Sequence, residues 1–211
     1  VKVASRNILK RKMYSFINAF GLSIGIAFSI LIYLYIQDER SFDQFHVNKD
    51  RLYRLESRSF KTHESNRDNQ FDTHAWLQLG LRPAVLDDLP EVEFATRFNP
   101  HDNVIVRNGD KVFTENVTLV DDHFFNMFTF QLLKGNKDLL FKNKSEVVLT
   151  PAIAEKYFGS EDPIGKSIGL NLGEDKLYTV AGIIEAPPAN SSLEFSILVP
   201  SENRNRYEDI V

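Results

Sequence analysis

The chain has 211 residues, of which 43% are hydrophobic and 26% are charged, and its formal net charge is −4. This composition is typical of a globular protein, and the length suits one domain or one domain with an appendage. Because the sequence has no cysteine, disulfides, a thiol nucleophile and cysteine-based zinc sites are excluded.

The charges divide the chain into three parts. Residues 1–14 carry basic side chains and no acidic one, and residues 15–36 carry no charge. Residues 37–211 hold the other 20 basic and all 29 acidic residues, a net charge of −9. Nucleic-acid binding needs a clustered basic face, so we expect no nucleic-acid partner. The basic residues of the first part are Lys2, Arg6, Lys10, Arg11 and Lys12.

Residues 15–36 are predicted to form a transmembrane helix in contact with lipid. A helix of this length spans roughly 33 Å, close to the roughly 30 Å hydrocarbon core of a bilayer. A signal peptide has a shorter apolar region and small residues at its cleavage site, whereas this segment ends in LIYLYIQDER. A buried soluble helix would carry a polar stripe, which is missing here.

The flanks of this helix predict its orientation. Basic residues precede it and Asp38 and Glu39 follow it, so the N-terminus is expected in the cytoplasm and residues 37–211 outside. Residues 1–14 are expected to lie along the inner membrane face as an amphipathic helix, or to be a loose tail that only sets topology. Gly21 and Gly25 have the small-xxx-small spacing that lets two membrane helices approach closely, and they are candidates for a helix contact.

After a polar connector at residues 37–50, strand-like and helical patterns alternate. The clearest is VIVRNGDKVF, in which Asn108-Gly109 predicts a two-residue hairpin turn because both residues tolerate positive φ. The other elements predicted before residue 130 are strands over 51–60, 92–98 and 115–121, a polar loop over 61–70, a helix over 73–90 and a short aromatic helix or turn over 122–128.

The last third of the chain has equally clear boundaries. Thr150 is a predicted N-cap for a helix over residues 151–158, with Pro151 at its first position, and Gly159 ends it. Residues 166–186 predict a hairpin around residues 173–175, and strands are expected over 145–150 and 195–200. This mixture predicts an α+β fold for residues 51–211, a mixed α/β core domain of one or two packed subdomains.

No motif predicts catalysis, a metal or a cofactor. The histidines lack metal-ligand spacing, so they are interpreted as ordinary surface residues, and no G-x-S-x-G or S-x-x-K motif marks a serine nucleophile. GSEDPIGKS departs from the phosphate-binding loop in spacing and follows a helix, so we predict a tight turn there. The five histidines are His46, His63, His74, His101 and His123.

Aromatic residues are concentrated just before residue 130. Core packing is the simpler interpretation of Phe124, Phe125, Phe128 and Phe130. The alternative is an interface, with Phe124, Phe125 and Phe128 contacting a second copy or a partner, because exposed aromatic clusters mark interaction surfaces.

Several segments, taken in order, resemble one known family. ASRNILKRKMYSFINAFGLSIGIAFSILI and QDERSFDQFHVNKDRLYRL are similar to the start and first membrane exit of FtsX/MacB-type ABC-transporter permeases of the Bacteroidetes form. VDDHFFNMFTFQLLKGN, VVLTPAIAEKYFGSEDPIGKSI and YTVAGIIEAPPANSSLEFSILVP resemble parts of the MacB-like periplasmic core domain. The resemblance runs over nearly the whole chain, and only the combination is specific.

The resemblance implies a permease subunit of the bacterial inner membrane. Such proteins have one membrane helix, a periplasmic core domain and three more membrane helices, and they act as dimers with a cytoplasmic ATPase, some with periplasmic adaptors or envelope partners. The chain starts at Val1 and ends at Val211, before any second hydrophobic span, so we expect it to be the N-terminal fragment of such a permease. An exporter or mechanotransmission role is therefore expected, with ATP hydrolysis in a separate subunit.

Two other functions stay open at this point. A membrane-anchored sensor would bind a ligand in the outer domain and signal through the single helix. An anchored envelope hydrolase would need a catalytic constellation that the sequence does not show.

Overall fold

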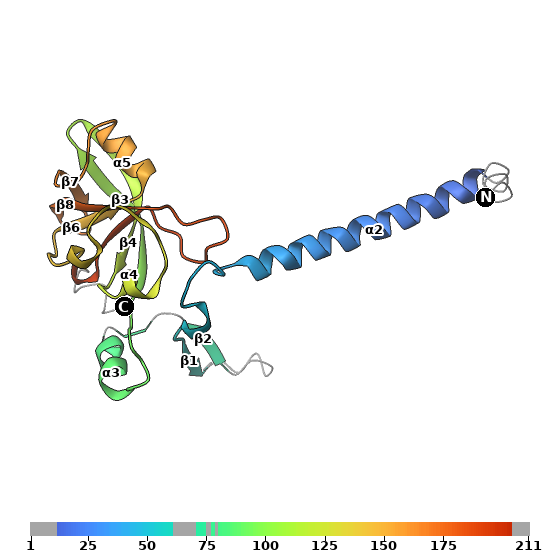
Figure 1. Cartoon of the computed structure of the whole chain (residues 1–211), viewed down its shortest axis with the longest axis horizontal. Helices are drawn as coiled ribbons and strands as arrows, with labels where there is room; N and C mark the ends of the chain where they lie inside the picture. The colour runs from blue at the N-terminus through green and yellow to red at the C-terminus, as the bar shows by residue number, and fades with distance from the viewer. Residues whose placement is uncertain (1–11, 61–70, 75–76, 79, 204–211) are drawn as a thin grey trace. The chain divides into compact units, whose positions relative to one another are not determined.

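The computed structural model describes residues 12–60, 71–74, 77–78 and 80–203. It divides into two compact units, Val1–Gln44 and Phe45–Val211. Within the first unit, α2 (Lys12–Ser41) is a single uninterrupted helix, drawn in blue in Figure 1. The predicted loop at 61–70, the leader up to residue 11 and His63 lie outside the described residues.

Helix α2 is long and apolar enough to cross a membrane. It covers the predicted span of 15–36 and continues for a turn beyond it at the C-terminal end. Its serines are compatible with lipid, because the Ser23 hydroxyl donates to the Ala19 carbonyl at 2.7 Å and the Ser29 hydroxyl to the Gly25 carbonyl at 2.9 Å. The hydroxyls therefore need no water inside an apolar environment.

The second unit is built on a mixed seven-stranded sheet whose strand order is β5-β8-β6-β9-β4-β3-β7. Strand β7 also pairs with β8, so the strands from β8 through β7 form a closed, barrel-like ring and β5 is added outside it. Two pairs, β4–β9 and β6–β8, are parallel and the others are antiparallel. The strands are β3 (Phe98–Asn108), β4 (Lys111–Val120), β5 (Leu132–Gly135), β6 (Glu146–Leu149), β7 (Ser167–Asn171), β8 (Asp175–Ile184) and β9 (Ile197–Pro200).

Two apolar clusters lie on opposite faces of these strands. One contains alternate strand residues such as Val147 and Leu149, and α5 (Pro151–Phe158) adds Ile153, Tyr157 and Phe158 to it. The other contains the intervening residues, such as Val148, and is covered by the aromatic segment around α4 (Phe124–Met127). The alternation follows from the two-residue period of a strand. The predicted α+β fold is confirmed.

The β3–β4 hairpin is confirmed, but its turn lies one residue later than predicted. Asn108 pairs with Lys111, so the two loop residues are Gly109 and Asp110. Gly109 has φ of 59°, and Asn108 does not have positive φ. Glycine with positive φ at the first position of a two-residue loop gives the turn a twist that matches that of the flanking strands.

The predicted helix over 73–90 is too long. Strand β2 (Phe71–His74) occupies its start, pairing with β1 (Ser57–Phe60), and helix α3 covers only Leu81–Asp88. The reason is Pro83, since proline is tolerated in the first turn of a helix but breaks its interior. The remaining described elements are the 3-10 turns η1 (Lys49–Arg51), η2 (Lys137–Leu139) and η3 (Ser201–Asn203).

The strand predicted over 51–60 is too long at its N-terminal end, and the strand predicted over 92–98 is wrong for all but its last residue. Strand β1 begins at Ser57, and β3 begins only at Phe98. In the second case the backbone N–H of Arg97 donates to the Asp121 side chain at 2.8 Å instead of to a neighbouring strand. Helix α5 has the predicted bounds, with Gly159 at its C-cap, but the Thr150 side chain makes no capping hydrogen bond.

Candidate functional site

The segment that follows α2 is fixed to the aromatic layer of the core domain. His46 is buried, and its Nδ1 accepts a hydrogen bond from the Thr129 backbone N–H at 3.1 Å. In return, the Val47 N–H donates to the Thr129 hydroxyl at 3.0 Å. The Asn48 side chain donates to the Asn126 and Met127 carbonyls at 3.3 and 3.2 Å. The chain is therefore held at the C-terminal end of α4 within a few residues of leaving the helix.

Aromatic rings complete this junction. The rings of Phe45 and Phe130 lie 5.7 Å apart, and the His46 ring contacts Phe128 and Phe130 edge-on, each at 5.2 Å. Phe130 in turn packs against the buried Phe124, with ring centroids 5.9 Å apart. Aromatic pairs at such distances contribute beyond their apolar area, so residues 45–48 and 124–130 act as one packed unit, which we call the junction.

A carboxylate cluster holds a second set of segments together. Asp121, 5% exposed, follows β4 and accepts from the Arg97 backbone N–H, Nε and Nη2 at 2.8, 2.9 and 2.6 Å. It also accepts from the Ser201 hydroxyl, and Arg82 Nε of α3 lies 3.3 Å away. The cluster thus ties α3, the start of β3, the end of β4 and the end of β9 together.

The electrostatics of Asp121 follow from these contacts. Burial alone would raise its pKa, but the hydrogen bonds from Arg97 and Ser201, with the charge of Arg97, lower the pKa below its ordinary value. Asp121 is therefore ionised at neutral pH and serves as the anionic centre of the cluster. An acid held in this state by four hydrogen-bond donors is structural, since it cannot accept a proton readily from a substrate.

The β3–β4 turn caps the C-terminus of α5. Lys111 Nζ donates to the Lys156 and Tyr157 carbonyls at 2.8 and 3.0 Å, and the Asn108 side chain donates to the Tyr157 carbonyl at 3.2 Å. The Tyr157 hydroxyl donates to Glu115 at 2.9 Å, and burial together with this bond raises the pKa of Tyr157. These contacts satisfy carbonyls that a helix end leaves open.

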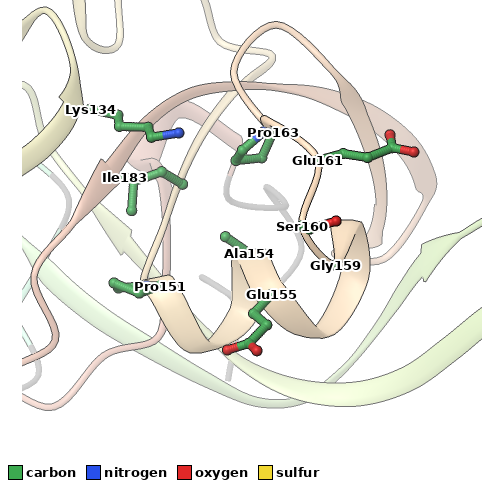
Figure 2. Close-up of a pocket in the computed structure, with 9 residues that line it drawn as sticks. All are labelled: Lys134, Pro151, Ala154, Glu155, Gly159, Ser160, Glu161, Pro163 and Ile183. Carbon is green, nitrogen blue, oxygen red and sulfur yellow. The ribbon is translucent and has the colours of Figure 1, made fainter.

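A surface pocket of about 430 Å³ lies beside α5, and Figure 2 shows the residues that line it. Its lining is mixed, with apolar residues such as Ala154 and Ile183 beside charged ones. Two of its charged residues are in local ion pairs: Lys134 Nζ lies 3.0 Å from Asp162, and Glu161 pairs with Lys166. These partners lower the pKa of both Asp162 and Glu161. In Figure 2, Glu155 and Glu161 point in different directions, so no acid pair converges on a common point in this pocket.

The predicted helix-contact positions lie on the apolar helix. An added Cβ at Gly21 or Gly25 would have no neighbouring atom within 4 Å. Both positions are therefore open to whatever surrounds α2, and their role in helix contact stays a prediction. Of the basic residues that set topology, Lys12 is the first residue of α2 and is exposed, whereas Lys2, Arg6, Lys10 and Arg11 lie outside the described residues.

The aromatic residues lie where the packing interpretation places them. Phe124 and Phe125 are buried and Phe128 is partly buried, all within the second apolar cluster. Contact with a partner through these residues stays a prediction.

No constellation for metal or acid–base chemistry is seen in the described part of the chain. Within it, no group of three His, Cys, Asp or Glu side chains could hold a metal ion. The GSEDPIGKS segment is a turn into β7: the Gly165 N–H donates to the Val180 carbonyl at 2.8 Å, and Lys166 N–H to the Pro163 carbonyl at 3.0 Å. Its backbone donors therefore serve the fold and do not form a phosphate cradle.

The sequence did not single out two residues that matter most here. His46 was interpreted as a surface residue but is buried, a correction that the sequence could have suggested only through its aromatic neighbour Phe45. Asp121 was part of a motif but had no assigned partner. Its hydrogen-bond donors Arg97 and Ser201 are 24 and 80 residues away in the sequence, and no local sequence pattern predicts such contacts.

The comparisons with known proteins agree with this architecture. The family model of the MacB-like periplasmic core domain matches residues 15–210. A domain assigned to a Porphyromonas gingivalis permease has a TM-score of 0.57 and 24% identity, over 66% of this chain and 59% of that one. No curated protein sequence matches significantly.

Two further solved structures are similar to smaller parts of the chain. The periplasmic region of MacB from Actinobacillus actinomycetemcomitans has a TM-score of 0.43 and 20% identity, over 57% of this chain and 55% of that one. The extracellular domain of the noncanonic ABC-type transporter YknZ from Gram-positive bacteria has a TM-score of 0.44 and 15% identity, over 56% and 60%. The chain thus spans less than two thirds of each of these three structures.

The family match covers most of the chain, including all but the first three residues of α2 and the whole barrel-like sheet. Together with the fold of the permease domain, it shows that this chain belongs to the family of MacB-like periplasmic core domains, preceded by a helix able to cross a membrane.

Proposed function

We propose that the chain is the first membrane helix and periplasmic core of a permease subunit in an ABC-type exporter or mechanotransmission complex. A separate cytoplasmic ABC ATPase hydrolyses ATP, and the subunit, as a homodimer or pseudo-dimer, converts this into movement of the outer domain. The N-terminus lies in the cytoplasm and residues 37–211 lie in the periplasm. A periplasmic adaptor or other envelope partner would receive the movement.

The observation that carries this proposal, beside the family, is the short connection to the junction. Helix α2 ends at Ser41, and Phe45 and His46 already belong to the packed aromatic layer. Three intervening residues can extend over only about 14 Å. A larger displacement of the helix end must therefore pull on the junction or break it.

The test is a linker insertion in the complete permease, co-expressed with its ATPase in membranes. A flexible Gly/Ser linker of about 12 residues, with a root-mean-square span of about 20 Å, is inserted between Phe42 and Asp43. The control carries the same linker at Gly173 in the β7–β8 turn. Since the chain has no native cysteine, a fluorophore on Lys142→Cys reports on the exposed surface of the outer domain.

We expect an ATP-dependent change of the label in the wild type and the control, and its loss in the Phe42–Asp43 variant. A membrane-impermeant maleimide should label Lys142→Cys from the periplasmic side only. Retention of the ATP response after insertion at Phe42, or labelling from the cytoplasmic side, would overturn the proposal. A response to a periplasmic ligand without any ATPase would support the sensor instead.

A further inference from the structure

Large apolar side chains are exposed on the segment that follows the helix. Val47 is 81% exposed, Tyr53 84% and Leu55 50%. The backbone at Val47 is held in place, because its N–H is hydrogen-bonded to Thr129 and the side chain of the neighbouring Asn48 is hydrogen-bonded to α4. Val47 is therefore exposed although its backbone is fixed. Leu52 has an extended backbone, and residues 53 and 55 have the spacing that shares one face of an extended chain.

The same segment is basic within an acidic domain. Residues 49–58 carry Lys49, Arg51, Arg54 and Arg58 against Asp50 and Glu56, a net charge of +2, whereas residues 59–211 carry 15 basic and 24 acidic residues, a net charge of −9. Two ion pairs of this segment are long and exposed, at 3.8 Å for Arg51–Glu93 and 3.7 Å for Arg54–Glu56. Exposed pairs of this kind are weak and exchange readily with other anions.

The segment follows the membrane-spanning candidate α2 closely along the chain. From Ile36 to Ser41, α2 adds roughly 7.5 Å beyond the predicted apolar span, which is about the thickness of one headgroup layer. Val47 follows six residues later. An apolar and basic segment at this point has the composition that binds at a membrane interface.

We propose that residues 47–58 form a lipid-contacting surface in the headgroup layer of the leaflet from which α2 emerges. Val47, Tyr53 and Leu55 enter the boundary between headgroups and acyl chains, where tyrosine is favoured. The guanidinium groups of Arg51, Arg54 and Arg58 lie against anionic headgroups. The inference rests on the proposal that α2 crosses the membrane.

The experiment uses single-cysteine variants of the full chain in nanodiscs, each labelled with an environment-sensitive fluorophore. Val47→Cys and Tyr53→Cys probe the surface. Leu177→Cys is the matched control, since Leu177 is apolar and 69% exposed but lies on β8. Ile26→Cys inside α2 reports on the membrane span itself. Nitroxide lipids, labelled either near the headgroup or deep in the acyl chain, act as quenchers.

We expect headgroup-region nitroxide to quench the labels at residues 47 and 53 at least about twofold more than the label at 177, because an interfacial segment is buried about 5–10 Å deep. Reversal of charge in Arg51→Glu/Arg54→Glu should reduce the quenching in bilayers that contain phosphatidylglycerol. Equal quenching at residues 53 and 177 would overturn the proposal. A fluorescence change that depends on the number of protein copies per disc, and not on the nitroxide lipid, would also overturn it, because the surface would then contact a second copy of the protein.

The label at Ile26 separates this inference from the proposed membrane span. Strong quenching of this label by deep nitroxide, with none at residue 53, refutes the lipid surface alone. Absence of quenching at both positions refutes the span. Unchanged quenching after charge reversal refutes the role of the arginines.

Discussion

Asp121 offers the sharpest test of how the core domain is held together. The substitution Asp121→Asn keeps the shape of the side chain but removes its charge, and it places an amide donor among the donors of Arg97 and Ser201. Hydrogen bonds to a charged group contribute about 1.5–3 kcal/mol each, and breaking a buried ion pair costs about 3–5 kcal/mol. Because Arg97 is partly exposed to water, we expect the lower end, a loss of about 3 kcal/mol.

The loss is measured by urea unfolding of the chain in mild detergent, followed by near-ultraviolet circular dichroism of the packed aromatic rings. With a slope of about 2 kcal/mol/M, the unfolding midpoint should fall by about 1.5 M. The matched control is Asp122→Asn, where 62% of the side chain is exposed and Arg82 donates one bond at 2.8 Å. Such a pair contributes about 0.2–1 kcal/mol, so its midpoint should move by no more than about 0.5 M.

The dependence on pH gives an independent check with a defined sign. Since the pKa of Asp121 lies below its ordinary value of 3.8, its stabilising contribution is complete above that value and is lost as the pH falls through the lower folded pKa. The gap between wild type and Asp121→Asn should therefore stay constant from pH 7 to about 5 and shrink below about 4. Equal midpoint shifts for Asp121→Asn and Asp122→Asn, or a gap that persists unchanged in acid, would refute the reasoning.

Three further substitutions, one of them with a matched control, test the packing around the barrel by the same unfolding assay. Gly135→Ala should cost more than about 2 kcal/mol, because φ is 104° and the new Cβ would lie 2.6 Å from the Ala181 carbonyl oxygen. Gly109→Ala, with positive φ but no atom within 4 Å, should cost only about 1 kcal/mol, and a similar loss in both would contradict the clash. Tyr157→Phe removes the bond to Glu115 and should cost about 1 kcal/mol; an unchanged unfolding midpoint would show that this bond does not stabilise the fold. Phe124→Ala, at a fully buried ring, should cost about 3–5 kcal/mol, and a loss below about 1 kcal/mol would place the ring at the surface.

Local signals explain what the sequence predicted well. Residues 15–36 are uncharged, apolar and long enough for a membrane-spanning helix, and α2 includes all of them. Pro151 and Gly159 mark the ends of α5 because proline has its φ preset for the first helical position, whereas glycine readily adopts the positive φ of 64° at the C-cap. The hairpin near Asn108 followed from turn chemistry, although the choice of the two central residues depended on strand register.

Long-range pairing explains what the sequence could not predict. The ring closes because Ile105, Val106 and Arg107 of β3 pair with β7, and no pattern within either strand specifies that partner. His46 is buried because the fold places it next to Thr129, which is 83 residues away in the sequence. The junction and the Asp121 cluster are therefore products of topology, which residue types alone do not encode.

The position of β9 has a consequence for the synthesis of the protein. This strand lies between β4 and β6, and Val117 pairs with Ile197 across 80 residues of chain. Until residues 197–200 emerge from the ribosome, β4 and β6 expose unpaired edges, and Asp121 lacks the Ser201 hydroxyl that helps to bind it. Such late closure is slow and leaves apolar strands open to aggregation. Nascent chains that stop short of residue 197 should therefore depend on chaperones, and release from them should coincide with the arrival of the last strand.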